Sequence, residues 1–260
     1  MNGLRNALAF LTRLPTEASK GIPFGTGARP GDIAAAIPWF PAVGWLVGAA
    51  VALVYAVLAA VLPGVPAATA AVATGVLITG ALHEDGLGDV ADAFGEARDR
   101  DETLRILRDA HLGTYGVLAV TAAFLLRTGA VAALDPWAAT AALPAAHALS
   151  RAAAITPTAL LPPAAEGLGA TYGRAATGGH VAVAIALALA LGAATLGPWA
   201  APAAVAAALG AVAPVRVAAT RIGGLTGDVL GAAQQGAEVA ILLLAAAVAH
   251  NGWAPFPWWR

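Results

Sequence analysis

Acidic side chains crowd one short stretch of this sequence. Nine of the fifteen Asp and Glu residues fall within residues 84–109, most densely in His83-Glu84-Asp85-Gly86-Leu87-Gly88-Asp89-Val90-Ala91-Asp92. On a helix, Asp85, Asp89, Asp92 and Glu96 would share one face, each about one turn from the next. Because like charges at that spacing repel one another, we expect a cation beside them. Carboxylate oxygens suit Mg²⁺, which often binds together with a phosphate substrate. The alternative is a solvated acidic face, but the acids follow an apolar run and have no interleaved lysines.

A second cluster follows in the same loop, Arg108-Asp109-Ala110-His111-Leu112-Gly113-Thr114-Tyr115-Gly116. The functional interpretation is that Arg108 holds phosphate oxygens, Asp109 completes the metal site, and Gly113 and Gly116 let the backbone approach a ligand. The structural alternative is an interfacial Arg-Asp ion pair followed by a helix start.

A third cluster is rich in glycine, Gly223-Gly224-Leu225-Thr226-Gly227-Asp228-Val229-Leu230-Gly231-Ala232. A glycine-rich turn that opens a helix offers backbone N–H groups to a phosphate, and Asp228 is a further candidate metal ligand. Arg151 stands inside an apolar run, where a charge is costly, so we rank it first among the buried arginines as a functional candidate. Arg127 and Arg216 lie nearer the ends of such runs, where snorkelling to the interface explains them.

The composition indicates the class of protein in which these clusters lie. The 260 residues are 59% hydrophobic and 11% charged, with a mean hydropathy of +0.76, which indicates an integral membrane protein. The formal net charge of −1 gives no support for nucleic-acid binding. The chain has no cysteine, which excludes disulfides, thiol catalysis and thiolate metal sites.

The fold expected is all-α, a single membrane-embedded catalytic domain over residues 1–260 with about seven transmembrane helices. The apolar runs long enough to cross a bilayer are 40–62, 67–83, 115–134, 138–161, 180–196, 200–220 and 236–251. In this arrangement every Lys and Arg outside the spans except Arg260 falls on one side, which the positive-inside rule makes cytoplasmic. The three clusters then share the cytoplasmic face.

Two further helices are expected beside the spans. Leu4, Ala7, Leu8 and Leu11 share a helix face opposite Arg5 and Arg13, which is typical of a helix lying on the cytoplasmic interface. The acidic segment after residue 83 is expected to form a helix within a cytoplasmic loop.

Taken in order and spacing, these motifs resemble the cobalamin synthase family, the adenosylcobinamide-GDP ribazoletransferases of the bacterial and archaeal inner membrane. The likeness runs nearly end to end. It rests on Thr12-Arg13-Leu14-Pro15, Phe40-Pro41 with Gly44, His83 with Asp85-Gly86-Leu87, Asp89 and Asp92, Arg108-Asp109 with Gly113-Thr114 and Gly116, Ser150-Arg151, Gly167-Leu168-Gly169, Gly223-Gly224, Thr226-Gly227-Asp228 and Gly231-Ala232. The chain departs from the family pattern at Ala93, Ala110 and Leu225, which bears on fine substrate contacts rather than on the metal ligands.

The resemblance implies an Mg²⁺-dependent enzyme that joins adenosylcobinamide-GDP to α-ribazole or its 5′-phosphate and releases GMP. The metal ligands implied are Asp85, Asp89, Asp92, Asp109 and Asp228. Arg108 would stabilise the leaving group, and Asp92 or His83 would act as general base. Substrate contacts would come from Arg13, Arg151, Gly113, Thr114, Gly223, Gly224, Thr226 and Gly227. Whether the protein forms homo-oligomers or associates with other cobalamin-assembly enzymes stays open.

Two other functions compete with this interpretation. The spaced aspartates are similar to those of CDP-alcohol phosphotransferases, which work at a membrane face. An ion-coupled secondary transporter is the rival from another class, and it predicts ionisable residues at the bilayer midplane on discontinuous helices. Because nearly every carboxylate is expected at the cytoplasmic ends of the spans, we favour the enzyme.

Overall fold

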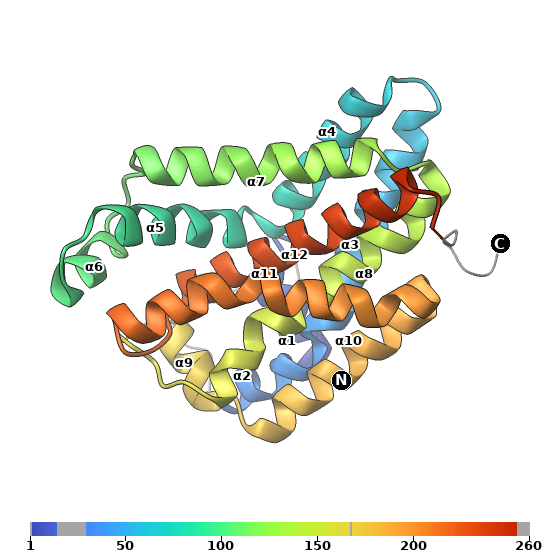
Figure 1. The fold of residues 1–260 in the computed structure, drawn as a ribbon. Coiled ribbons are helices and arrows are strands. Elements are labelled where there is room, and N and C mark those ends of the chain that lie inside the picture. Colours follow the sequence, from blue (N-terminus) through green and yellow to red (C-terminus); the bar gives the residue numbers. More distant parts are fainter. Residues whose placement is uncertain (1, 15–29, 167, 254–260) are drawn as a thin grey trace.

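The structure is a computed structural model that describes residues 2–14, 30–166 and 168–253. Throughout these ranges every regular element is a helix (Figure 1). The elements are α1 (Asn2–Leu11), α2 (Pro30–Ala36), η1 (Ile37–Trp39), α3 (Phe40–Ala59), α4 (Gly64–Thr79), α5 (Leu82–Glu96), α6 (Arg100–Ile106), α7 (Thr114–Ala132), α8 (Pro136–Ile155), η2 (Thr156–Ala159), α9 (Leu168–Ala175), α10 (Gly178–Leu196), η3 (Gly197–Trp199), α11 (Ala200–Arg221) and α12 (Gly227–His250). The all-α expectation is confirmed. Pro15, Gly167 and Arg260, named in the sequence analysis, lie outside the described residues. Lys20 and Arg29, two of the charges counted for the orientation, lie outside them as well.

Four stretches of the described chain are long and apolar enough to cross a membrane: Ile33–Ala59, Thr114–Ala132, Gly178–Arg221 and Gly227–His250. A fifth is added if α4 and α5 together count as one broken span. Side chains such as Leu53, Leu118 and Leu209 on the outer faces of these helices are more than 60% exposed, as expected where lipid replaces water. A membrane protein is therefore supported, whereas the count of seven spans is not confirmed.

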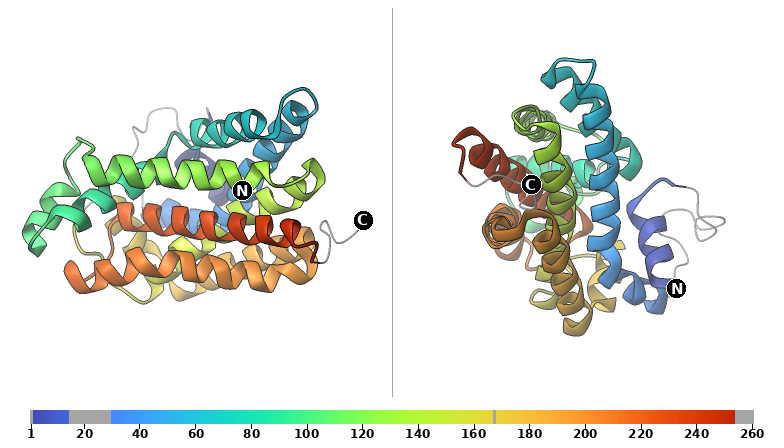
Figure 2. Two further views of the ribbon diagram at one scale, coloured as in Figure 1. Left: turned by 45° about the horizontal axis from the view of Figure 1, so that its top comes forward. Right: turned by 90° about the vertical axis from the view of Figure 1, so that its right-hand side faces the viewer.

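The difference in span count has an identifiable origin. The stretch Gly178–Arg221 contains both α10 and α11, which run in opposite directions in Figure 1. The helix α8 has the length of a span, yet it is not among the candidates. Most of its residues, including His147, Ser150 and Arg151, are buried by neighbouring helices. It packs mainly against α3, α12 and α10 and so forms the centre of the bundle (Figure 2).

The first apolar hairpin ends in a sharp bend. The axes of α4 and α5 differ by 91°, and Gly80 and Ala81 between them both have positive φ angles, 66° and 59°. Ala81 N–H donates to Val76 O (2.9 Å) and Gly80 N–H to Leu77 O (3.2 Å), which is a Schellman motif. A Cβ atom on Gly80 would overlap the side chain of Arg13. The bend therefore needs glycine for both its conformation and its packing.

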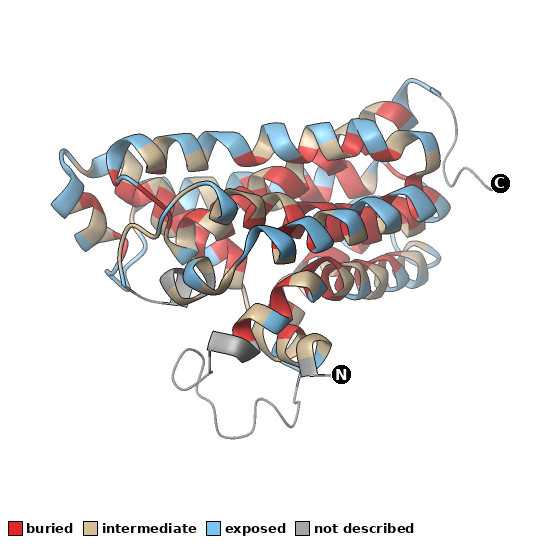
Figure 3. Ribbon diagram, turned by 90° about the horizontal axis from the view of Figure 1, so that it is seen from below, coloured by how far each residue is buried: buried red, intermediate tan, exposed pale blue. Residues whose placement is uncertain are grey.

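The helix α1 packs on the bundle instead of lying apart from it. Ala7 and Leu11 are buried, and the main neighbours of α1 are α2, α3 and η1. Figure 3 shows the general rule for the fold, since buried residues face the centre and exposed residues face outward along each long helix. The apolar face of α1 thus belongs to the protein interior.

Candidate active site

A cavity of about 280 Å³ lies where α1, α3, α5, α8 and α12 meet. Its ionisable lining comes from His83 and Asp85 in the first turn of α5, Arg151 near the end of α8, and Asp228 in the first turn of α12. The structure therefore brings together two residues of the acidic cluster, four residues of the glycine-rich cluster (Gly227, Asp228, Leu230 and Gly231) and the arginine ranked first. It is the best candidate for an active site.

Glycines allow the two helices that carry the acids to touch. A Cβ atom on Gly86 of α5 would lie 2.8 Å from Asp228 O and 2.9 Å from Asp228 Cα. On the facing helix, a Cβ atom on Gly231 would lie within 3.4 Å of Gly86 Cα. Asp89 is close enough to interact electrostatically with Asp85, Asp228 and Asp92. The first turns of α5, which carry Asp85 and Asp89, therefore pack against the start of α12.

The glycine-rich turn does open a helix, as predicted. Gly223 has a φ angle of 73°, and Leu225 exchanges backbone hydrogen bonds with the 162–164 segment, to Pro162 O (2.9 Å) and from Ala164 N–H (2.8 Å). The Thr226 hydroxyl accepts a hydrogen bond from Val229 N–H and caps α12. Gly224 packs so closely on Pro162 O that a side chain would not fit. Gly227, next to Asp228, lines the cavity.

Arginines outside the cavity hold this turn in place. Arg100 of α6 donates from Nε to Ile222 O (3.3 Å) and from Nη2 to Ala164 O (3.1 Å). Arg221 donates from Nη1 to Phe94 O near the end of α5 (2.8 Å). These hydrogen bonds join the glycine-rich turn to the 162–164 segment and to the end of α5.

Asp92 has a structural partner that the sequence analysis did not foresee. Its two carboxylate oxygens accept hydrogen bonds from Gly113 N–H (2.7 Å) and Gly116 N–H (2.8 Å), and the residue is 4% exposed. The glycines at the start of α7 thus let its backbone approach a carboxylate of the protein itself. Thr114, the first residue of α7, is exposed. The Asp92 carboxylate therefore caps the first turn of α7.

The second cluster does not line the cavity. Arg108 and Asp109 are exposed, and Asp109 Oδ1 lies 2.7 Å from Nδ1 of His111. Hydrogen bonds from His111 lower the pKa of Asp109. The length of α5 explains why the second cluster lies away from the cavity. The helix has 15 residues, and each residue adds about 1.5 Å to its length. Asp85 lies in its first turn, whereas the 107–113 turn meets its far end.

Arg13 also lies outside the cavity lining. Its backbone N–H donates to Ile78 O (2.7 Å), and its side chain packs against Gly80 at the bend between α4 and α5. Arg13 therefore packs against the bend that precedes α5.

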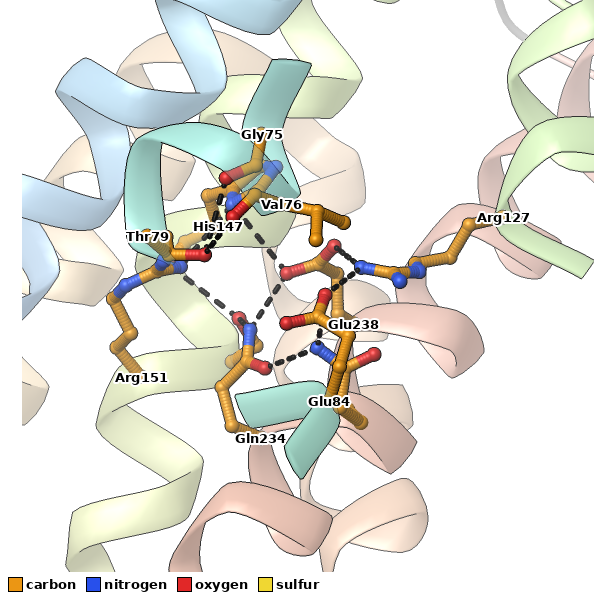
Figure 4. A network of polar contacts seen from close by, with 11 residues as sticks. Gly75, Val76, Thr79, Glu84, Arg127, His147, Arg151, Gln234 and Glu238 are labelled. Carbon is orange, nitrogen blue, oxygen red and sulfur yellow. Dashed lines mark hydrogen bonds and ion pairs between the residues drawn. The ribbon is translucent and has the colours of Figure 1, made fainter. Parts of the chain in front are cut away.

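Behind the cavity lies a buried network of polar side chains, drawn in Figure 4. Arg127 of α7 donates from Nη1 to Glu84 Oε1 of α5 (2.9 Å) and lies 3.3 Å from Glu238 Oε1 of α12. Gln235 donates to Glu84 Oε1 (3.2 Å) and Gln234 to Glu238 Oε2 (2.6 Å). Two carboxylates and one guanidinium thus tie three helices together.

The network continues to the cavity through α8. His147 Nδ1 lies 3.4 Å from Glu238 Oε2, and Arg151 Nη1 donates to His147 O (2.8 Å). Gln234 Nε2 also donates to Ser150 Oγ (3.0 Å). Arg151 is 2% exposed and lines both the network and the cavity. The formal charges of the network sum to zero, because it contains two Glu and two Arg side chains: Glu84, Glu238, Arg127 and Arg151.

The snorkelling interpretation of Arg127 is wrong. Its side chain is 4% exposed and points inward to Glu84 and Glu238, because a buried guanidinium is stable only when paired. Arg216 is exposed, and its snorkelling to the interface stays a prediction. The expectation that carboxylates lie at span ends also missed Glu238. One signal was readable, since Gln234, Gln235 and Glu238 interrupt an apolar run within one turn.

The residues described by the structure contain no group of three or more His, Asp or Glu side chains already placed to hold a metal ion. The donor set nevertheless has the right chemistry, because Asp85, Asp89 and Asp228 supply only oxygen ligands. Mg²⁺ commonly uses one or two protein carboxylates and completes its shell with water and substrate phosphates. The three acids thus fit a site that a phosphate ligand completes.

The fold and the site define a helical membrane protein whose interior presents acids and one arginine at a cavity suited to phosphate groups. A family model described as cobalamin-5-phosphate synthase matches residues 3–246, and the chain belongs to that family. The resemblance found in the motifs is confirmed.

Relatives agree over nearly the whole chain. The adenosylcobinamide-GDP ribazoletransferase of Bradyrhizobium diazoefficiens is 45% identical over 248 residues, covering 94% of this chain and 93% of the relative. Enzymes of the same name from Ralstonia nicotianae and Mesorhizobium japonicum are 40% and 39% identical, with at least 90% of every chain covered. No solved structure matches the chain.

Proposed function

We propose that this protein transfers the adenosylcobinamide-phosphate group of adenosylcobinamide-GDP to α-ribazole or α-ribazole 5′-phosphate, with release of GMP. This is the final assembly step of the cobalamin nucleotide loop. Family membership and the names of the relatives support the activity. The structural observation that carries it is the meeting of Asp85, Arg151 and Asp228 from three helices at one cavity.

In the proposed site, Asp85, Asp89 and Asp228 hold Mg²⁺. The bound ion would neutralise charge on the diphosphate, which is the main requirement of phosphoryl transfer. Among the residues that the structure describes, Arg151, fixed by His147, is the positively charged side chain that lines the cavity. We therefore place Arg151 before Arg108 and Arg13 as the contact that stabilises the departing phosphate.

The proposed general base is His83, which lines the cavity beside Asp85. A neutral imidazole nitrogen there would take the proton of the attacking ribose hydroxyl. Asp92 is the weaker candidate, because both of its oxygens accept backbone hydrogen bonds. Asp109, Gly113 and Thr114 lie at the far end of α5, and we assign them no direct role.

The proposal includes a location. The motifs and the excess of Lys and Arg on one side favour an active site on the cytoplasmic face of the inner membrane. Single cysteines introduced at Asp99 and Ala201 test this arrangement in the cysteine-free chain. They should be labelled from opposite sides of the membrane, and labelling from the same side would refute the seven-span arrangement.

One observation favours an ion-coupled transporter, namely the carboxylates of Glu84 and Glu238 inside the bundle. Both are within ion-pair distance of Arg127, so neither is free to carry an ion. The network is better explained as support for the cavity.

The activity can be tested with purified protein in detergent. Adenosylcobinamide-GDP, α-ribazole and Mg²⁺ should give GMP and a cobamide product in equal amounts. GMP release that does not require α-ribazole would identify a hydrolase instead. No release under any condition would contradict the proposal, provided that the protein elutes as a single folded species.

A further inference from the structure

The cavity has two chemically different sides. The charged side carries His83, Asp85, Arg151 and Asp228. The rest of the lining, called the apolar side below, contains one hydroxyl, that of Thr158, and its largest members are Phe10, Leu11, Ile37, Phe40, Leu82 and Ile155. A ligand that fills this space must combine an anionic or hydroxyl-bearing part with an apolar part.

Two aromatic rings dominate the apolar side. Phe10 of α1 and Phe40 of α3 stack with their centroids 5.6 Å apart and their planes 10° apart. Phe40 is 5% exposed, whereas Phe10 is only partly buried. Both phenylalanines line the cavity, and Phe10 is the more exposed of the two. Stacked rings of this kind favour a further flat aromatic group.

We propose that this apolar side, centred on Phe10, binds the aromatic base of the acceptor nucleoside. The inference rests on the proposed function and identifies where its second substrate lies. The base packs against Phe10, Ile37 and Ile155, and the ribose extends toward the acids and His83.

The chemistry of the two possible bases decides between them. Guanine, the base of the donor, carries an amino group and a carbonyl on its ring edge. Buried against carbon, those groups would lose hydrogen bonds to water, which costs about 1–3 kcal/mol each. The benzimidazole base of α-ribazole has no exocyclic polar group. The apolar side therefore suits the acceptor and not the guanine.

Size leads to the same assignment. A volume of about 280 Å³ is just below the usual range of ligand cavities, roughly 300–1,000 Å³. It can hold a nucleoside-sized group but not the corrin ring system of the donor. The corrin ring must remain outside, with only its diphosphate reaching Arg151.

The test compares Phe10→Ala with Phe124→Ala. Phe124 is a partly buried phenylalanine packed on the core from α7, and it does not line the cavity. We expect Phe10→Ala to raise the KM for α-ribazole about tenfold or more. The KM for adenosylcobinamide-GDP should stay within twofold, and Phe124→Ala should change neither value.

Two additional measurements keep the result interpretable. Phe10→Leu retains most of the apolar volume and should have a smaller effect than Phe10→Ala, which guards against a folding defect. Equilibrium dialysis of α-ribazole without donor measures acceptor binding when no turnover occurs, and Phe10→Ala should weaken it to the same degree.

The outcomes separate this inference from the proposed function. If wild-type protein makes no GMP, the proposed function fails, whatever the behaviour of Phe10. If wild-type protein is active but Phe10→Ala leaves acceptor KM and acceptor binding unchanged, the inference is overturned. A rise in donor KM alone would also overturn it, because it would place the guanine on the apolar side.

Discussion

Arg127 of α7 and Glu84 of α5 form an ion pair of 2.9 Å in the interior of the helix bundle. The same guanidinium lies 3.3 Å from Glu238 of α12, so a single side chain connects three helices. Glu84 immediately precedes Asp85, and the pair therefore helps fix the start of α5 at the cavity.

Removing Arg127 should be strongly destabilising. Arg127→Leu leaves Glu84 and Glu238 without their nearest cation, and breaking a buried pair costs about 3–5 kcal/mol. Unfolding in SDS titrations measures the loss. The exposed Arg216→Leu is the control and should shift stability by less than about 0.5 kcal/mol. The double variant Arg127→Leu with Glu84→Gln restores charge balance and should recover part of the loss. Equal stability of all variants would show that the pair contributes nothing.

Asp228 and Asp109 should differ in their effect on metal use. Asp228 lines the cavity, so Asp228→Ala should lower kcat by about 10²-fold or more and raise the Mg²⁺ concentration needed for half activity. Asp109 is bound to His111 at the protein surface, so Asp109→Ala should keep kcat and the Mg²⁺ requirement within about threefold. GMP release measured across a Mg²⁺ titration checks both. Loss of activity in Asp109→Ala alone would reverse the assignment.

Asp92 should matter for stability more than for metal binding. Asp92→Ala leaves Gly113 N–H and Gly116 N–H without their shared acceptor, and each hydrogen bond to a charged group contributes about 1.5–3 kcal/mol. A lower thermal midpoint in detergent is expected. The residual activity should retain the wild-type Mg²⁺ requirement, whereas a changed requirement would restore Asp92 as a metal ligand.

Gly80→Ala should distort the bend between α4 and α5. An L-residue at this positive φ costs about 1–2 kcal/mol, and the added methyl group would also overlap Arg13. The matched control is Gly129→Ala in α7, where a new Cβ atom would meet nothing within 4 Å. Because alanine favours helix over glycine, this control should be neutral or stabilising. The two variants are compared by unfolding in SDS titrations, and equal stability would argue against a strained bend.

Local patterns in the sequence were enough to predict part of the candidate site. The helix that carries Asp85 and Asp89, the glycine-rich turn before Asp228, and the buried position of Arg151 all follow from short-range spacing and hydropathy. Contacts between distant segments left no such signal. Glu84 stands in the densest acidic stretch of the sequence, but nothing there indicated that it lies about 100° around the helix from Asp85 and pairs with Arg127.

Spacing along the axis also misled the prediction for Asp92. It shares an arc with Asp85, but seven residues separate them, which is about 10 Å of helix length. Asp85 therefore reaches the cavity while Asp92 reaches the start of α7. The partner of Asp92 depends on how α5 and α7 pack, which periodicity does not encode.

The bend at Gly80 and Ala81 has an electrostatic consequence. If α4 and α5 formed one continuous helix, its peptide dipoles would pass through this point with no free end. Interrupting it creates a helix start inside the protein, with first-turn N–H groups that lack intrahelical partners and a partial charge of about +0.5. The start of α12, at Gly227 and Asp228, faces the same cavity. Two such dipole ends give an otherwise acidic cavity a fixed attraction for anions that no side-chain titration can remove.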